Sequence, residues 1–163
     1  VTYTNTTGNN GQVLTSNGAG ETSWTTISVA QTTYVVGTSY AELGGTVIQL
    51  SPNGKHGLVV TDQDQGTSNW HEANNFLSEP SAHDANGQEF LDWRLPTKRE
   101  LYLLVDKITQ TGTPGSPAQY WGSTQTDYGE AWSAKRNTWS GIGAIFVNSN
   151  KNDTNSVRAV RAF

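Results

Sequence analysis

The residues best suited to contact a ligand lie between residues 126 and 148, where aromatic, charged and small polar side chains are mixed. Rigid Tyr and Trp rings supply contact area and short polar groups supply adaptable hydrogen bonds, a combination typical of binding surfaces. No period of 2 or of 3.6 residues persists between Trp132 and Val157, so this segment cannot be buried throughout. The alternative interpretation is an ordinary surface loop between two strands. The residues predicted to contact a ligand are Thr126, Tyr128, Gly129, Ser133, Lys135, Arg136, Asn137, Trp139, Ser140, Ile142, Phe146 and Asn148.

Binding without reaction is the chemistry that these side chains support. The expected apolar anchors are Trp139, Tyr128 and Ile142, and the expected polar determinants are Arg136, Lys135 and Asn137. Both a protein and a glycan remain open as the ligand, because Trp and Tyr rings stack on sugar faces as readily as they fill protein pockets.

Catalytic signatures are missing from the sequence. None of the three histidines, His56, His71 and His83, has the i, i+4 partner or HExxH context of a zinc site. There is no GxSxG elbow, and no Gly-rich loop leads into a helix as a phosphate site requires. The chain has no Cys, which excludes a thiol nucleophile, a disulfide and a thiolate metal site. We therefore predict that the protein is not an enzyme and has no catalytic residues.

Calcium is the one metal ion for which the acidic residues offer suitable ligands. Asp62, Asp64 and the 79–84 loop could supply carboxylate and backbone oxygens, but their spacing matches no EF-hand, so a calcium site is not favoured. The net charge of −4 and the pI near 5.2 argue against nucleic acid or an anionic membrane as the main partner. No apolar run is long enough for membrane insertion.

Residues 1–33 form a distinct segment rich in Thr, Asn, Gly and Ser, with Glu21 as the only charge, and alone it could not bury enough surface to fold. Two short β-prone pieces, Val13–Leu14 and Trp24–Ile27, flank the turn signal Asn17–Gly18. A flexible linker is the alternative. Because the chain begins at Val1 and has no Met, we expect it to be part of a longer protein.

The elements that must position the binding residues lie in residues 34–163. Residues 46–50 and 57–60 predict a hairpin around a Ser-Pro-Asn-Gly turn. Asn69 with Glu72, and Thr97 with Glu100, are capping boxes that predict two helices with apolar stripes. Strands and long turns follow from residue 120, and the alternation of apolar residues from Val157 to Phe163 predicts one anchoring strand. Strands, two helices and further strands predict an α+β fold with helices packed on an antiparallel sheet.

Ordered blocks along residues 34–163 resemble the C-type-lectin-fold family typified by the C-terminal domain of a collagen-like bacterial adhesin. The specific blocks are Trp-Arg-Leu-Pro-Thr at 93–97 and Val-Arg-Ala-Val-Arg at 157–161. The resemblance implies a compact lectin-like domain, often trimeric on a fibre, that binds ligands and does no chemistry. Formylglycine-generating enzymes share this fold, but their catalysis needs cysteines. Trp121 and Trp132 lie in the family's fixed blocks, and we therefore assign both to the core.

The segment Gly11–Ile27 resembles short repeats near the ends of phage tail fibres and of some bacterial surface fibres, where three chains wind together. The Asn-rich close at 150–158 resembles variable proteins of diversity-generating retroelements, in which adenine-directed mutagenesis scatters Asn codons. Residues 126–129 and 133–147 resemble scattered positions. Glu130, Lys135 and Trp139 cannot arise from an Asn codon by adenine changes alone, so they are template text or evidence against diversification.

These resemblances imply a receptor-binding protein at the tip of a phage tail fibre. The protein would form a homotrimer through residues 1–33, and its partner would be a protein or glycan receptor on a bacterial surface. The expected location is the virion, with neither nucleic-acid binding nor membrane insertion. The alternatives are a bacterial cell-surface adhesin and a domain that caps and trimerises the fibre without diversification.

Overall fold

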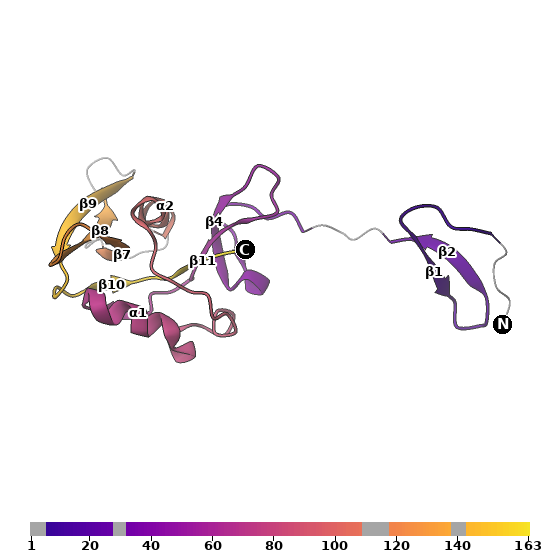
Figure 1. Ribbon diagram of the computed structural model, residues 1–163, viewed down its shortest axis with the longest axis horizontal. Helices are drawn as coiled ribbons and strands as arrows, with labels where there is room; N and C mark the ends of the chain where they lie inside the picture. The colour runs from indigo at the N-terminus through magenta and orange to yellow at the C-terminus, as the bar shows by residue number, and fades with distance from the viewer. Residues whose placement is uncertain (1–5, 28–31, 109–117, 138–142) are drawn as a thin grey trace. The chain divides into compact units, whose positions relative to one another are not determined.

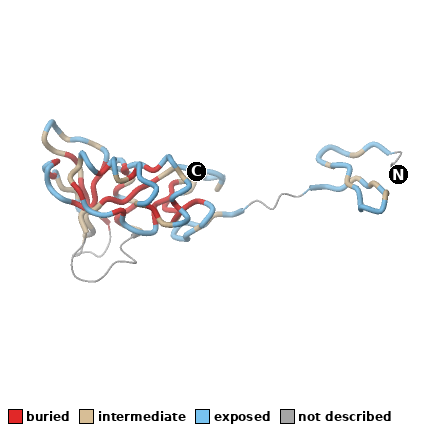
Figure 2. The backbone as a smooth tube through the Cα atoms, turned by 90° about the horizontal axis from the view of Figure 1, so that it is seen from below, coloured by how far each residue is buried: buried red, intermediate tan, exposed pale blue. Residues whose placement is uncertain are grey.

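A computed structural model describes residues 6–27, 32–108, 118–137 and 143–163. The chain divides into two compact units, 1–32 and 33–163, which are described separately (Figure 1). The core lies in the second unit, whereas most described residues of the first are exposed (Figure 2).

The first unit is the hairpin that the turn signal predicted. β1 (Gln12–Ser16) and β2 (Thr22–Thr26) pair antiparallel. In the turn, Asn17 Oδ1 accepts hydrogen bonds from the backbone N–H groups of Ala19 (2.9 Å) and Glu21 (3.2 Å). Trp24 is not free, because its indole Nε1 donates to the carbonyl of Thr6 over 2.7 Å. The hairpin leaves apolar side chains exposed at Val13, Leu14 and Ile27.

Two sheets and two helices make up the second unit, and its class is α+β, as predicted, with the arrangement of a C-type-lectin-like fold. The four-stranded sheet runs β11-β5-β4-β3, with β3 (Ser39–Tyr40), β4 (Gly45–Leu50), β5 (Gly57–Val60) and β11 (Val160–Ala162). The five-stranded sheet runs β6-β10-β7-β8-β9, with β6 (Gly66–Ser68), β7 (Tyr120–Gln125), β8 (Glu130–Arg136), β9 (Ala144–Asn150) and β10 (Asn155–Val157). Short 3-10 turns are η1 (Ala41–Leu43) and η2 (Pro80–Ala82). β4 and β5 form the predicted hairpin.

Helix α1 (Trp70–Ser78) begins where its predicted cap lies. Asn69 Oδ1 accepts a hydrogen bond of 2.9 Å from the Glu72 backbone N–H, satisfying one of the helix's unpaired donors. The helix buries Ala73 and Leu77. Its first residue, Trp70, is therefore held at a defined place beside the five-stranded sheet, to which α1 connects through β6 and β10.

Helix α2 (Lys98–Ile108) also confirms its predicted capping box. Thr97 Oγ1 accepts from the Glu100 backbone N–H, and Glu100 Oε2 accepts from the Thr97 backbone N–H over 2.8 Å. Arg94 donates two hydrogen bonds of 2.7 Å to the same carboxylate. These bonds, led by that of Arg94, lower the pKa of Glu100 to about 2. The helix packs on β7 and β8 (Figure 1) through its fully buried apolar residues, Leu101, Leu104 and Val105.

The C-terminal segment is not one strand, and that prediction is wrong. β10 belongs to the five-stranded sheet and β11 to the four-stranded sheet, so the chain crosses between sheets at Arg158 and Ala159. Val157, Ala159 and Val160 are all fully buried because the crossing lies between both layers. The segment therefore joins the two halves of the core.

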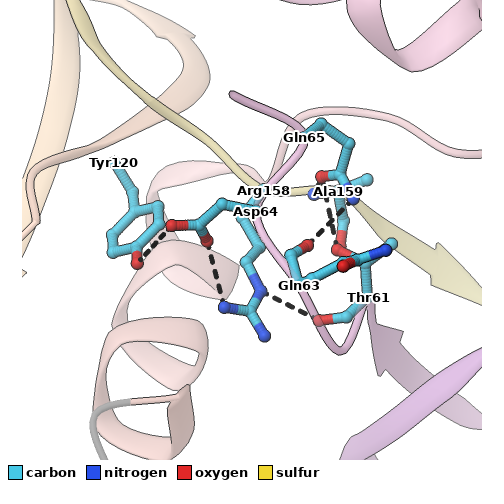
Figure 3. A network of polar contacts seen from close by, with 7 residues as sticks. All are labelled: Thr61, Gln63, Asp64, Gln65, Tyr120, Arg158 and Ala159. Atoms are coloured by element: carbon cyan, nitrogen blue, oxygen red, sulfur yellow. Dashed lines mark hydrogen bonds and ion pairs between the residues drawn. The ribbon is translucent and has the colours of Figure 1, made fainter. Parts of the chain in front are cut away.

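A polar network holds this crossing in place (Figure 3). Arg158 Nε donates to the carbonyl of Thr61 over 2.8 Å, and its Nη1 donates to Asp64 Oδ1 over 3.0 Å. The hydroxyl of Tyr120, at the start of β7, donates to the other carboxylate oxygen over 3.2 Å. Burial, with the negative charge of Asp64, raises the pKa of Tyr120 to about 12. The strand that leads towards the predicted ligand surface is thus tied to the C-terminal crossing.

Candidate ligand-binding site

The turn between β7 and β8 presents a fully exposed aromatic ring. Tyr128 is 100% exposed. Its turn is closed by Asp127 Oδ1, which accepts hydrogen bonds of 2.8 Å from the backbone N–H groups of both Gly129 and Glu130. Thr126 is half-buried, and its backbone N–H donates to the carbonyl of Glu130. The ring is therefore exposed on a backbone whose conformation is held from inside the turn.

A buried lysine holds the same turn from below. Lys151 is 4% exposed, and its ammonium donates to Gln125 Oε1 (2.5 Å), to the carbonyl of Asp127 (3.1 Å) and to the carbonyl of Tyr128 (2.9 Å). An ammonium has three donors, so all are used. Within the described part of the chain, no carboxylate forms an ion pair with it. Backbone oxygens of the turn therefore replace a counter-ion, and the lysine and the turn depend on each other.

The Trp70–Tyr128 pocket, of about 520 Å³, lies between this turn and the start of α1. Its walls combine two aromatic rings, an imidazole and side-chain amides. The lining residues are Trp70, His71, Gln125, Tyr128, Gly129, Asn150, Lys151 and Asn152. Trp70 is fixed because its indole donates to the carbonyl of Gly122 over 2.8 Å and its backbone N–H donates to the carbonyl of Lys151 over 2.9 Å.

A second hollow, the α2 groove, lies between helix α2 and β9, an edge strand of the five-stranded sheet, and has a volume of about 500 Å³. It is lined by Gln49, Lys98, Arg99, Tyr102, Leu103 and Phe146. Lys98 Nζ lies 3.3 Å from the ring centroid of Trp132, whose ring meets that of Phe146 edge to face at 6.1 Å. Trp132 is therefore half-buried beneath a lysine, and its assignment to the core is wrong, whereas Trp121 is fully buried as expected.

The residues predicted to form one surface are distributed over the sheet. Tyr128 and Gly129 line the Trp70–Tyr128 pocket, and Phe146 lines the α2 groove. Asn148 is exposed on β9, and Lys135 and Asn137 are half-buried. Trp139, Ser140, Ile142 and the side chain of Arg136 lie outside the described residues.

Ser133 does not lie on the surface, and its predicted display to a ligand is wrong. The residue is fully buried, and its hydroxyl lies 2.7 Å from Ser149 Oγ. It also donates to the carbonyl of Val147 and accepts from Gln119 Nε2. Val147 and Ser149 lie on β9 and Gln119 directly precedes β7, so a small polar residue here completes a buried hydrogen-bond network.

Two of the carboxylates considered for calcium, Asp62 and Asp64, already have partners. Asp62 accepts from the hydroxyls of Ser39 (2.5 Å) and Thr46 (2.6 Å), and Asp64 belongs to the Arg158 network. Across the described ranges, no three His, Asp or Glu residues gather as a metal site requires. Among these same residues, no helix is both long enough and apolar enough to span a membrane.

Sequence reasoning missed Trp70, His71 and Lys151 as pocket residues, and also His83 as a core residue. His83 is 7% exposed, stacks on Trp93 at 5.4 Å and contacts the carbonyl of Leu77 through Nε2. A lysine inside an Asn-rich run carries no sequence signal of burial. These positions follow from tertiary contacts between segments that are far apart in the sequence.

The two helices and two sheets define an α+β domain of the C-type-lectin-like class. Comparison with protein families identifies the chain more closely: the Lcl C-terminal domain matches residues 53–161, and the chain belongs to this family. The family is associated with phage tail fibres and cell-surface adhesins. No curated protein matches the chain.

Proposed function

We propose that this chain is the receptor-binding part of a phage tail fibre, and that it attaches the virion to a bacterial surface. One observation carries the proposal: Tyr128 is completely exposed on a turn whose backbone is held by hydrogen bonds to the buried ammonium of Lys151 and to the carboxylate of Asp127. A turn whose backbone is held before binding loses less entropy when its aromatic residue contacts a partner, which is how rigid paratopes gain affinity. A large exposed ring does not stabilise the fold. We therefore infer that the turn beneath it is held in place to present the ring to a partner.

The first unit supports the part of the proposal in which three copies of the chain form a trimer. A two-stranded hairpin is at best marginally stable in water. β1 and β2 leave Val13, Leu14 and Ile27 between 39% and 58% exposed, and association of three copies would cover them. Three tips on one fibre would then convert weak single contacts into strong attachment through effective concentration.

The proposal includes diversification of the exposed turn by a retroelement. Position 128 can accept any side chain without steric conflict, because Tyr128 is fully exposed. The scaffold beneath it depends on the Arg158 network. A segment that can vary without loss of folding is what such a system requires. Sequencing of the coding segment for residues 120–163 in a source population, with the neighbouring genome, tests this part through substitutions confined to adenine positions of a template repeat.

Attachment is tested with labelled full chain and bacterial cells from the source community. Tyr128→Ala should lower cell binding by about tenfold, the effect of losing one hot-spot aromatic residue. His56→Ala is the control, since His56 is exposed on the β4–β5 hairpin of the other sheet. Equal binding of the wild type and Tyr128→Ala, with trimers intact, would refute attachment through this turn and favour the fibre-capping function.

A cell-surface adhesin is the second candidate, because the family includes adhesin domains. Its contact surface would be the same. Antibody labelling of bacterial cells and of purified virions separates the two: label on virions supports the tail fibre, and label on cells supports the adhesin.

A further inference from the structure

We infer that the Trp70–Tyr128 pocket binds a neutral hexopyranose unit, and that Lys151 is the positioning residue that gives the pocket its shape. The inference rests on the proposed receptor-binding function and names the ligand class of its central residue. Nothing in the family match assigns this pocket or its ligand.

The walls of the pocket suit a sugar in size and in chemistry. A volume of about 520 Å³ falls within the range of small-ligand sites, roughly 300–1,000 Å³. The negative faces of aromatic rings attract the C–H groups on the face of a pyranose, and the ring of Tyr128 is completely open. Side-chain amides at Asn150 and Asn152 each offer donors and acceptors, which match hydroxyl groups that both donate and accept.

The charge of the pocket favours a neutral sugar over an acidic or sulfated one. Lys151 is the only Lys or Arg among the lining residues, and its three donors are occupied by Gln125, Asp127 and Tyr128. A ligand carboxylate or sulfate could receive a charge-assisted bond from Lys151 only if one of these internal bonds broke. A neutral hydroxyl group does not need a charge-assisted bond from Lys151.

A protein side chain fits this pocket less well than a sugar. Hot spots of protein interfaces are desolvated pockets that receive aromatic or apolar anchors. Here the rings alternate with amides and an imidazole, all of which would lose water to an apolar anchor without gaining a partner.

Lys151 joins the two walls of the pocket through four separate contacts. Its ammonium bonds to the carbonyl of Tyr128 and lies 4.8 Å from the ring centroid of Trp70. Its backbone N–H donates to the carbonyl of Gly129, and its carbonyl accepts from the Trp70 N–H. One residue therefore sets the distance between the first turn of α1 and the β7–β8 turn, without reaching the ligand itself.

The test uses the full chain and the methyl glycosides of glucose, galactose and mannose, with glucuronic acid and a sulfated hexose as charged comparisons. Binding is followed by NMR, through the indole N–H of Trp70 and the backbone N–H of Tyr128. At least one neutral glycoside should shift both signals, and the charged sugars should bind more weakly. Absence of binding by all three neutral glycosides, or preference for a charged sugar, would overturn the inference.

Variants assign the site. Tyr128→Ala and Asn152→Ala should each weaken binding of the glycoside by about tenfold. Tyr102→Ala is the matched control, because Tyr102 is an exposed tyrosine of the α2 groove, and it should bind as the wild type does. Lys151→Met should weaken binding and also broaden or shift the Tyr128 N–H signal without sugar, which a role in direct contact alone would not do. Asn152→Ala keeps the test valid if Lys151→Met does not fold, since Asn152 is exposed.

Failure of this inference and failure of the proposed function give different results. Cell attachment that depends on Tyr128 but is not inhibited by the glycosides would leave the receptor-binding function and reject the sugar. Sugar binding in the pocket without attachment to any source cell would support the pocket and reject the receptor function.

Discussion

Replacement of Arg158 by Met should destabilise the second unit strongly, because Arg158 holds the crossing between the two sheets. Its side chain is 9% exposed and donates to the Thr61 carbonyl, and Thr61 is itself 3% exposed. Met fills similar volume but cannot donate, so the carbonyl loses a charged donor at a cost of about 1.5–3 kcal/mol. The ion pair adds less, about 0–1 kcal/mol, since the side chain of Asp64 is 37% exposed and can return to water.

The sum is a loss of about 1.5–4 kcal/mol in the free energy of unfolding. A unit of about 130 residues unfolds with an entropy of roughly 0.28 kcal/mol/K, so Tm should fall by about 10 °C. Urea unfolding followed by tryptophan fluorescence measures the free energy, and calorimetry measures Tm.

Two further variants make the Arg158 experiment decisive. Asp64→Asn should cost less than Arg158→Met, because it removes the ion pair of about 0–1 kcal/mol and disturbs the hydrogen bond from Tyr120, but leaves the donor to the Thr61 carbonyl in place. Arg99→Met is the control, since Arg99 is exposed and makes no ion pair with any described residue. Buried ion pairs can sometimes be replaced by apolar groups without loss. A stability of Arg158→Met within about 0.5 kcal/mol of wild type would show that the Thr61 carbonyl finds another donor, and it would refute the reasoning.

Three other predictions concern pH, diversity and assembly. The pKa of Glu100 falls from 4.5 to about 2 on folding, so its contribution to stability is complete above pH 4.5 and is lost as the pH falls towards 2. Glu100→Gln should flatten urea stability against pH in this range, and an unchanged slope would exclude Glu100 as its source. In a diversified population, residue 128 should vary widely while residue 133 stays small, because Ser133 is fully buried; large residues at 133 in functional virions would contradict this. Leu14→Ser should lower the mass of the assembly in sedimentation, whereas Val36→Ser, an exposed position of the second unit, should not; a trimer that survives Leu14→Ser would place assembly elsewhere.

Both helices could be predicted from the sequence because their start signals are local. The predicted caps join atoms of residues three apart: Thr97 and Glu100 form both bonds of a capping box, and Asn69 forms the N-cap bond to the Glu72 backbone N–H. The N-terminal hairpin follows the same rule, since the Asn17 side chain closes its own turn. For such elements, distant parts of the chain add stability but do not change the type of structure.

The C-terminal segment shows where periodicity stops being informative. Val157, Ala159 and Val160 suggested one strand with a buried face, yet Val157 and Val160 lie on strands of different sheets and Ala159 lies in the crossing between them. Alternation reports which side chains avoid water and not which sheet the backbone joins. The choice of sheet depends on Arg158 reaching Thr61, a residue far away in the sequence.

The sequence by itself determined the α+β class, the caps of both helices, the hairpins and the family of the chain, and it placed Tyr128 in a segment predicted to lie at the surface, where the residue is fully exposed. Only the tertiary structure decided that Ser133 is buried, that Trp132 lies beneath Lys98, and that Lys151 joins Tyr128 to Trp70. The physical reason is the range of the interactions. Caps and turns form between residues a few positions apart, whereas the burial of a side chain and the walls of a pocket depend on remote segments that strand pairing brings together.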